Sequence, residues 1–522
     1  MIDDLLKLSS LGIYIHAASV SITLGFPIMI GITLWKLYKK KDERFLQEAK
    51  ILTAILAINF ALGGVTGTLV EFGLVQIWPG TIFAIESFAF APLTLELIAF
   101  ISEVVFLIFF IVTLGKWNPK RSMAILAIYW IFALLSGALI TSVNSWMQSP
   151  QGTGPVASAI YPFMPSYGQV SVDVRKLVSL KLTLLSTKEP LSLILQQPYF
   201  ANNTGIILEN PYSAFTGIYF TASILHNLTA AVIVGLSLAA SGYSYRYFKT
   251  KDSHYVELLK PSFLVLFVLM LIQPTIFGHL MGTAVVDNQP TKFASMEGAN
   301  TTYVNPLMGL LAYGDPNHPI IGYDQLYQSC RIYGNMTFLD LAKAIGINQS
   351  QLTALNVSSE IMNMKIENVC LADLNSAEAN IETIHYSYYT KISTGILALL
   401  SSALLALTYY RIKGLSWLSN KLTRNGSAKM IFIYATLLFV SASTTSILGW
   451  FVREVGRKPW TVYGLLYPQD VVTPVQLSYS PGFLAFASLV IIFVAILGYT
   501  AMFIVATRPS ILKRINSSRG GS

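Results

Sequence analysis

The sequence predicts an all-α polytopic membrane protein with about nine transmembrane helices and two long extracytoplasmic loops. Hydrophobic residues make up 53% of the 522 residues and charged residues only 12%, whereas about a quarter of the residues of a soluble domain are charged. Crossing a bilayer takes about 20 consecutive, mostly apolar residues in a helix. Such stretches run over Leu11–Leu37, Ile51–Phe72, Ile85–Leu114, Met123–Trp146, Ala214–Tyr243, Pro261–Met281, Tyr386–Leu407, Ile431–Arg453 and Gly482–Ala506.

The charged residues around these stretches predict their orientation. Asp3 and Asp4 precede the first stretch, so it lacks the basic start of a cleaved signal peptide and is expected to be a retained span. Lysine and arginine are enriched in cytoplasmic loops, and here they follow spans one, three, five, seven and nine. We therefore expect the N-terminus outside and the C-terminus in the cytoplasm. These cations include Lys39, Lys40, Lys41, Arg44, Lys116, Lys120, Arg121, Arg246, Lys249, Lys251, Arg411, Lys413, Arg508 and Lys513.

The net charge of +9 is then mostly a topology signal, and nothing in the sequence supports nucleic-acid binding. Two long polar stretches, 150–212 and 283–384, fall outside by the same count. The second contains both cysteines, Cys330 and Cys370, and two thiols in one extracytoplasmic loop favour a disulfide. N-glycosylation sequons stand at Asn202, Asn300, Asn335, Asn348 and Asn356.

The two loops divide the chain into groups of spans. Residues 1–149 hold spans one to four, 213–282 hold spans five and six, 385–507 hold spans seven to nine, and 508–522 form a cytoplasmic tail. Within the second loop, TFLDLAKAIGINQSQLTALN has the signals of a short helix–turn–helix. Thr337 is expected to cap its first helix and Gly346 to end it. We interpret this segment, vaguely similar to small wall-binding modules, as a structural insert.

Ionisable residues inside the spans indicate a functional site, because such residues are costly at membrane depth. His16 in span one and His226 in span five are each either a hydrogen-bonding residue between helices or an axial haem ligand. Three acids accompany them: Glu71, Glu96 and Glu103. Seven residues separate Glu96 from Glu103, so both lie on one helical face, as a proton relay requires. Pairing these acids with intramembrane bases is the alternative, and Lys391 is the main partner for it.

The segment GWFVREVGRKPW, from Gly449 to Trp460, places Glu454 close to the end of span eight, with Arg457 and Lys458 just beyond it. A salt-bridged helix end is the simpler interpretation, and a functional carboxylate is the other. Span directions put His16, Glu71 and Glu454 at shallow depth near the outer face. Glu103 is deeper, toward the cytoplasm, where it can pass protons outward.

Several motifs, in order along the chain, resemble those of subunit I of the cytochrome bd family of quinol oxidases. They are GxxTGxxxEF (63–72), APLTLE (91–96), NSWMQSP (144–150), QPTKFASME (289–297), HPIIGY (318–323) and GWFVREVGRKPW (449–460). The resemblance implies that this chain binds haem b, in low-spin and high-spin forms, and haem d or a further haem b. It also implies quinol and oxygen as substrates and a second membrane subunit as partner, although a homodimer remains an alternative.

The resemblance also implies roles for single residues. His16 and Glu454 would each serve one high-spin haem, with Glu96 and Trp450 beside them, and His226 would be an axial ligand of the low-spin haem. Arg457 would pair with a haem propionate, Glu71 would line the high-spin pocket, and Glu103 would belong to the proton path. Lys292 and Glu297 would bind quinol in the polar outer loop.

The chain departs from the family pattern at the low-spin haem. Ser393 stands where the family has a methionine ligand, and Lys391 replaces the usual arginine. Either His385 or another side chain completes that haem, or it is five-coordinate, or it is absent. The family also spaces the two span-three acids by eight residues rather than seven, which rotates one of them by about 100°.

These observations predict a terminal oxidase subunit that oxidises quinol at the outer face and reduces oxygen with cytoplasmic protons. One alternative is a related haem protein that oxidises quinol or transfers electrons without reducing oxygen. Another, from a different class, is a proton-coupled transporter. Transporters often show internal repeats and broken helices near the midplane, and the sequence indicates neither.

Overall fold

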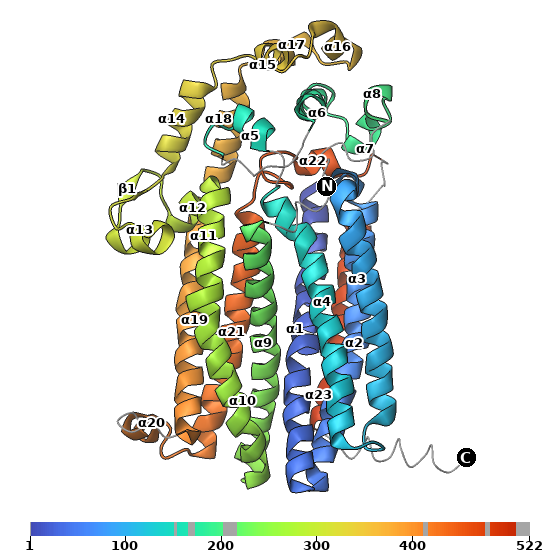
Figure 1. Ribbon diagram of the computed structural model, residues 1–522, viewed down its shortest axis with the longest axis vertical. Helices are drawn as coiled ribbons and strands as arrows, with labels where there is room; N and C mark the ends of the chain where they lie inside the picture. Colours follow the sequence, from blue (N-terminus) through green and yellow to red (C-terminus); the bar gives the residue numbers. More distant parts are fainter. Residues whose placement is uncertain are drawn as a thin grey trace, which may run out of the picture.

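The computed structural model describes residues 2–150, 154–164, 173–201, 217–410, 416–474 and 481–507. Within them, nine helices are long and apolar enough to cross a membrane, which confirms the predicted fold class. Figure 1 shows these helices side by side in one bundle. They are α1 (Ile2–Lys40), α2 (Glu43–Gln76), α3 (Pro79–Thr113), α4 (Pro119–Gln148), α9 (Ile218–Thr250), α10 (Ser253–Ile272) continued by η2 (Gln273–Gly278) and α11 (His279–Asn288), α19 (Ile381–Tyr409), α21 (Ala428–Val455) and α23 (Pro481–Thr507).

Several of these helices begin before the apolar stretches, and polar side chains cap their starts. The Asp42 carboxylate accepts a hydrogen bond from the Arg44 amide at 3.0 Å at the start of α2. Asn118 caps α4 in the same way, at 3.0 Å from the Lys120 amide, and Asp252 caps α10. Such side chains satisfy amides that a helix start leaves unpaired. The hydrophobic pattern therefore locates a span but underestimates its helix.

The sixth span is interrupted by a turn of π-helix, η2, between α10 and α11. Pro274 lies within this turn, and proline cannot donate the backbone hydrogen bond of a regular α-helix. Single π-turns inside helices are frequent at functional sites. The side chain of Gln273, the first residue of η2, contacts His226 on α9.

Helices α1 and α9 touch through their backbones near the middle of the bundle. A β-carbon on Gly235 would overlap the carbonyl oxygen of Ser21, and one on Gly25 would overlap the backbone of Leu236. Small residues allow such close packing between membrane helices. The contact fixes the spacing between the helices that carry His16 and His226.

We expect Gly235→Ala to force α1 and α9 apart and to lower the melting temperature of the protein in detergent. The added methyl group overpacks the contact, which typically costs about 1–3 kcal/mol. Gly242→Ala on the same helix is the matched control, because a β-carbon there meets no atom within 4 Å. Equal melting temperatures of the two variants, followed by circular dichroism, would contradict the proposed contact.

The connecting segments gather at the end of the bundle where the chain begins, and α23 ends at the opposite end (Figure 1). The described parts of the two long loops, 150–212 and 283–384, therefore lie at the same end of the bundle as the N-terminus. Asn202 and the tail 508–522 lie outside the described residues. The connecting elements are α5 (Gly154–Ile160), α6 (Val174–Thr187), α7 (Leu191–Ile194), α8 (Pro198–Ala201), α12 (Pro290–Glu297), β1 (Tyr303–Val304), α13 (Pro306–Tyr313), β2 (Pro319–Ile320), α14 (Tyr323–Tyr333), α15 (Phe338–Ala344), α16 (Gln349–Ala354), α17 (Ser359–Asn363), α18 (Ile366–Glu378) and α22 (Pro468–Val471), while α20 (Ser416–Leu422) lies at the other end.

The insert in the second loop is held by a disulfide and by helix caps. Cys330 on α14 and Cys370 on α18 are bonded, with their Cα atoms 5.8 Å apart. Thr337 caps α15 in a capping box with Asp340, and Gly346 follows that helix with a φ of +81°, as its sequence predicts. Strands β1 and β2 form a short antiparallel pair that joins Tyr303 to Ile320.

A buried polar cluster ties the two long loops to the segment after α21. Asp373 accepts hydrogen bonds from the hydroxyls of Tyr161 and Tyr467 and, at 3.1 Å, from the Trp460 indole. Burial raises the pKa of Asp373, while the charge of buried Lys181 opposes this rise. Trp460 ends the GWFVREVGRKPW motif, so this cluster anchors the end of the motif to the two long loops.

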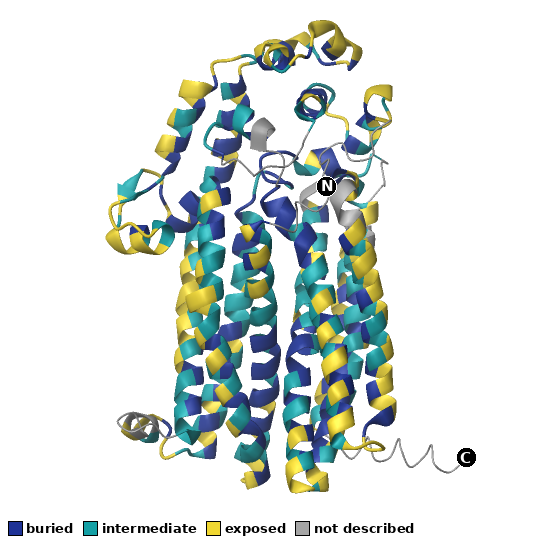
Figure 2. Cartoon of the chain, in the orientation of Figure 1, coloured by how far each residue is buried: buried dark blue, intermediate teal, exposed yellow. Residues whose placement is uncertain are grey.

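Several long helices carry exposed residues, drawn in yellow in Figure 2, and many of these residues are large and apolar. On α3 they include Leu97, Ile101 and Val105, and on α23 they include Phe493 and Phe503. In a membrane protein such faces contact lipid or another subunit.

Candidate functional site

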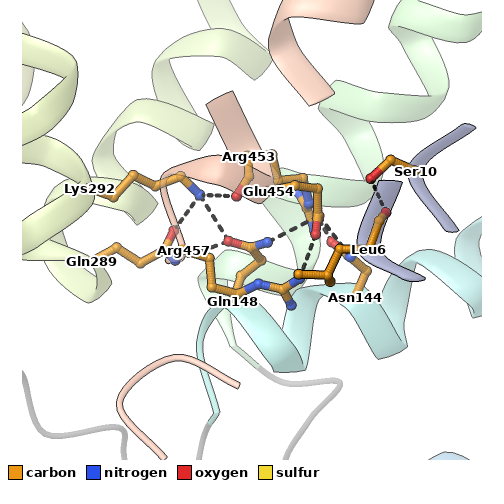
Figure 3. Close-up of polar contacts among 9 residues, drawn as sticks. All are labelled: Leu6, Ser10, Asn144, Gln148, Gln289, Lys292, Arg453, Glu454 and Arg457. Carbon is orange, nitrogen blue, oxygen red and sulfur yellow. Dashed lines mark hydrogen bonds and ion pairs between the residues drawn. The ribbon is translucent and has the colours of Figure 1, made fainter. Parts of the chain in front are cut away.

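Glu454 lies in the last turn of α21 and accepts hydrogen bonds from three side chains (Figure 3). Its Oε1 accepts from Asn144 Nδ2 at 3.0 Å and from Gln148 Nε2 at 3.3 Å. Its Oε2 is paired with Arg457 Nη2 at 2.5 Å. Asn144 and Gln148 lie one turn apart on α4 and therefore face the same way. The end of α4 thus presents two amides to the carboxylate at the end of α21.

The neighbouring Arg453 braces the same helix ends. Its guanidinium donates to Asn144 Oδ1 at 2.5 Å and to Ser223 Oγ on α9 at 2.7 Å. It also lies 5.6 Å from the centre of the Trp450 ring. Fixed donors of this kind orient Asn144, whose amide then reaches Glu454.

Lys292 joins this cluster from the second loop. Its ammonium donates to Gln148 Oε1 at 2.9 Å, to Gln289 Oε1 at 3.1 Å and to the Arg453 carbonyl at 3.0 Å (Figure 3). The side chain is only 2% exposed, and burial holds the pKa of Lys292 well below its ordinary value. The sequence suggests a polar loop here, whereas α12 is buried and the Lys292 side chain reaches α4 and α21. The sequence pattern does not indicate this, because two of the three acceptors come from distant segments.

Arg457 has two hydrogen-bond donors that contact no acceptor among the described residues. One nitrogen, Nη2, is paired with Glu454, whereas Nε and Nη1 are buried and have no hydrogen-bond partner among the described residues. A buried donor without an acceptor is costly. A carboxylate such as a haem propionate would accept a charge-assisted hydrogen bond from either nitrogen, although Nε and Nη1 lie on different edges of the guanidinium. The residues at the end of α21 therefore fit the group that the sequence resemblance implies.

His16 lies on α1, and its ring faces α2. Its Nδ1 is 3.2 Å from the Thr66 hydroxyl, and Thr66 also bonds to carbonyls of its own helix. A β-carbon on Gly67 would be 2.8 Å from the ring, so this glycine makes room for the imidazole. The threonine and glycine of the GxxTGxxxEF motif thus both serve to position His16.

His226 lies between α9 and the π-turn. Gln273 Nε2 is 3.2 Å from His226 Nδ1 and donates to the His226 carbonyl at 2.9 Å. A β-carbon on Gly278, at the end of the same turn, would lie 3.9 Å from the ring. The π-turn therefore shapes the surroundings of this histidine and fixes its orientation.

The three acids of the second and third spans differ in their surroundings. Glu71 is exposed in the single chain. Glu96 is partly buried and accepts a hydrogen bond from Ser136 at 2.8 Å. Glu103 is 4% exposed, and its Oε1 has no partner among the described residues. Electrostatic interactions join Glu71 to Glu96 and Glu96 to Glu103, so the three carboxyl groups form one series.

Ser393 is unsuited to bind iron in this arrangement. Its side chain is exposed, and its hydroxyl donates to the Tyr389 carbonyl of its own helix at 2.9 Å. Lys391 lies against Gly449 of α21, 3.6 Å from the position of a β-carbon there. The hydrophobic pattern identifies neither contact.

Glu297 and Lys292 reach opposite sides of α12. Five residues apart on a helix, they point about 140° away from each other. Glu297 accepts a hydrogen bond from the Tyr389 hydroxyl on α19 at 3.1 Å, far from the acceptors of Lys292 on α4. His385, four residues before Tyr389, also faces this part of α12, with Nδ1 2.9 Å from the Met296 carbonyl.

Single-residue reasoning missed Asn144, Gln148, Gln273, Gln289 and Arg453. Two of them stand in the NSWMQSP motif, where their spacing of four residues places both on one helical face. That spacing is the sequence signal by which these two residues could have been found. No such signal identifies Gln273, because the π-turn that presents it depends on tertiary packing.

A family model described as cytochrome bd terminal oxidase subunit I matches residues 8–509. The chain belongs to this family. Two proteins of Bacillus subtilis (strain 168), a putative cytochrome bd menaquinol oxidase subunit I and a cytochrome bd ubiquinol oxidase subunit 1, are each 22% identical over 469 residues, 88% of this chain and 86% and 83% of theirs.

The fold also matches a solved structure. A chain in the structure of bd oxidase from Geobacillus thermodenitrificans superposes with a TM-score of 0.67 at 19% identity, covering 97% of this chain and 98% of that one. Members of the cytochrome bd family are respiratory terminal oxidases that normally bind haem and act with a partner subunit in the membrane. The chain is therefore a membrane protein of this oxidoreductase family.

Proposed function

We propose that this chain is the haem-containing subunit I of a quinol-oxidising terminal oxidase that reduces oxygen to water. The Glu454 cluster is the observation that carries the proposal. It combines a carboxylate at a membrane boundary with an arginine whose two remaining nitrogens need an acidic partner. A salt bridge that served only to end a helix would not require those extra buried donors.

His16, Glu454 and His226 are the residues that would hold haem iron, and Arg457 would hold a propionate. Haem supplies one-electron transfer and oxygen reduction when it is bound, and its protein ligands set which of these it performs. The high-spin sites would take haem d or haem b. The amides of Asn144 and Gln148 keep the Glu454 carboxylate oriented, as partners of metal ligands commonly do.

Protons for oxygen reduction would reach the site along α3. Glu103 is buried, lies deeper than Glu96 and interacts with it electrostatically. Glu71 continues the series. Carboxyl groups spaced along one path can exchange protons by way of water, and buried acids in membranes commonly form such relays. We propose uptake from the cytoplasmic end, with the N-terminus outside, so that turnover builds a membrane potential.

Ser393 favours a second candidate function. Its hydroxyl is committed to its own helix, so the low-spin haem lacks the ligand that the family pattern has there. A protein with this change could oxidise quinol and transfer electrons without reducing oxygen.

The exposed apolar faces of α3 and α23 suit a second membrane subunit or another copy of the chain, as well as lipid.

An optical spectrum together with oxygen uptake tests the proposal. The purified membrane complex is expected to show both low-spin and high-spin haem bands and to consume oxygen when quinol is added. Haem bands that quinol reduces, without oxygen uptake, would favour the second function. A preparation without haem bands after expression with adequate haem supply would contradict both.

A further inference from the structure

The face of α12 that carries Glu297 meets the start of α19 in a small polar cluster. Glu297 is 5% exposed, and its Oε1 has no hydrogen-bond partner among the described residues. Its Oε2 accepts from Tyr389 at 3.1 Å. Burial raises the pKa of Glu297, while the hydrogen bond from Tyr389 opposes this rise. One carboxylate oxygen is thus held in place, and the other is buried without a partner among the described residues.

His385 completes this cluster. Its ring lies 4.7 Å from the Tyr389 ring, and Gly298, with a φ of +65°, allows the imidazole to pack against the end of α12. A β-carbon on Gly298 would be 2.9 Å from His385 Nδ1. Because the Met296 carbonyl is an acceptor, it selects the tautomer with the proton on Nδ1. Nε2 then carries a lone pair, and no described residue donates a hydrogen bond to it.

We propose that His385 is a catalytic base for quinol oxidation, accepting one hydroxyl proton at Nε2 while Glu297 Oε1 accepts the other. This inference rests on the proposed function, which supplies quinol as the substrate. Both groups contact Tyr389, Glu297 from α12 and His385 from α19, so the two acceptors belong to one cluster. The same contacts give His385 a role at the quinol loop, which competes with its alternative role as a haem ligand.

The reaction balances with these two bases. Oxidation of a quinol to a quinone breaks two O–H bonds and releases two protons and two electrons. One proton goes to His385 and one to Glu297, and the electrons go singly to ferric haem, the oxidant in the proposed function. General bases placed within hydrogen-bond reach typically accelerate such steps by about 10²–10⁴-fold.

The test compares two electron donors in the complete membrane complex. A short-tail naphthoquinol or benzoquinol must lose protons as it is oxidised, whereas tetramethyl-p-phenylenediamine gives up an electron without releasing a proton. Anaerobic stopped-flow reduction of the haem is measured with each donor. We expect His385→Ala to slow reduction by quinol about 100-fold, to keep the rate with the diamine, and to recover part of the quinol rate when free imidazole is added.

His318→Gln is the matched control. His318 lies in the same loop and also has Nδ1 near a carbonyl, that of Pro319 at 2.9 Å, but it stacks on Tyr313 rather than beside Glu297. It should keep both rates, and Glu297→Gln should slow only reduction by quinol. Unchanged quinol rates in His385→Ala would overturn the proposal. Loss of the low-spin spectrum together with both rates would also overturn it, in favour of a haem-ligand role.

Anaerobic haem reduction keeps this test separate from the proposed function. If the wild-type complex is reduced by quinol but consumes no oxygen, oxygen reduction fails while the role of His385 is still decided by the two donors. If quinol does not reduce the wild-type haem and the diamine does, then quinol oxidation is absent and the role of His385 is overturned with it.

Discussion

Glu454→Ala is expected to abolish oxygen consumption and to remove one high-spin haem from the optical spectrum, while the protein still inserts in the membrane. The carboxylate is the centre of the cluster formed by Asn144, Gln148 and Arg457. Loss of even an outer partner of a metal ligand typically costs about 10–100-fold in affinity or activity. Removing the ligand itself should therefore reduce turnover by at least about 100-fold. Oxygen electrode rates and haem content per polypeptide measure the effect.

A second buried glutamate provides the control. Glu48 on α2 is paired with Arg246 at 2.5 Å, outside the site, so Glu48→Ala also removes a carboxylate from an arginine pair. It should lower thermal stability but leave the haem spectrum and the specific activity per haem unchanged. If both variants lose haem to the same extent, Glu454 has a structural role and not a ligand role.

The fold was largely predictable because hydrophobicity acts on each span separately. A stretch such as Leu11–Leu37 reports its own transfer into the bilayer and needs no information about its neighbours. Capping residues such as Thr337 are local for the same reason. The helix ends were less predictable, because polar residues such as Asp42 extend a helix beyond the membrane without changing the apolar pattern.

The site was predictable only where one residue is unusual in its own span. Histidines and acids inside apolar stretches attract attention by themselves, as His16 and Glu103 do. Amides such as Gln148 do not, because their importance comes from residues far away in the sequence. Gln148 joins Lys292 to Glu454 across segments about 140 and 300 residues apart, and only the folded chain brings them together.

The burial of Lys292 was not predictable for the same reason. By its sequence, the QPTKFASME segment is polar and is expected to be an exposed loop. In the structure three acceptors around its ammonium group make burial tolerable, because a buried charge is stable only when it is paired or fully hydrogen-bonded. Lys292 therefore links the loop to the Glu454 cluster, while Glu297 turns toward α19.

His226→Ala is expected to eliminate the low-spin haem spectrum and to stop reduction of the remaining haem by quinol. Gln273 and the π-turn position this imidazole in the span, and an alanine leaves nothing there to bind iron. Rates should fall by at least about 100-fold, since the metal ligand itself is lost. Reduced-minus-oxidised spectra of the purified complex measure the loss.

Ser393→Ala tests whether the residue expected opposite His226 contributes to the low-spin haem. The Ser393 hydroxyl is bonded to its own helix and the side chain is exposed, so its removal should leave the low-spin spectrum unchanged. A changed spectrum would show that Ser393 contributes to the haem pocket. An intact low-spin spectrum in His226→Ala would contradict the ligand assignment itself. If His226→Ala and His385→Ala both lose the low-spin spectrum, the two histidines bind one iron. If only His226→Ala loses it, His385 acts at the quinol loop, where its Nδ1 contacts the Met296 carbonyl.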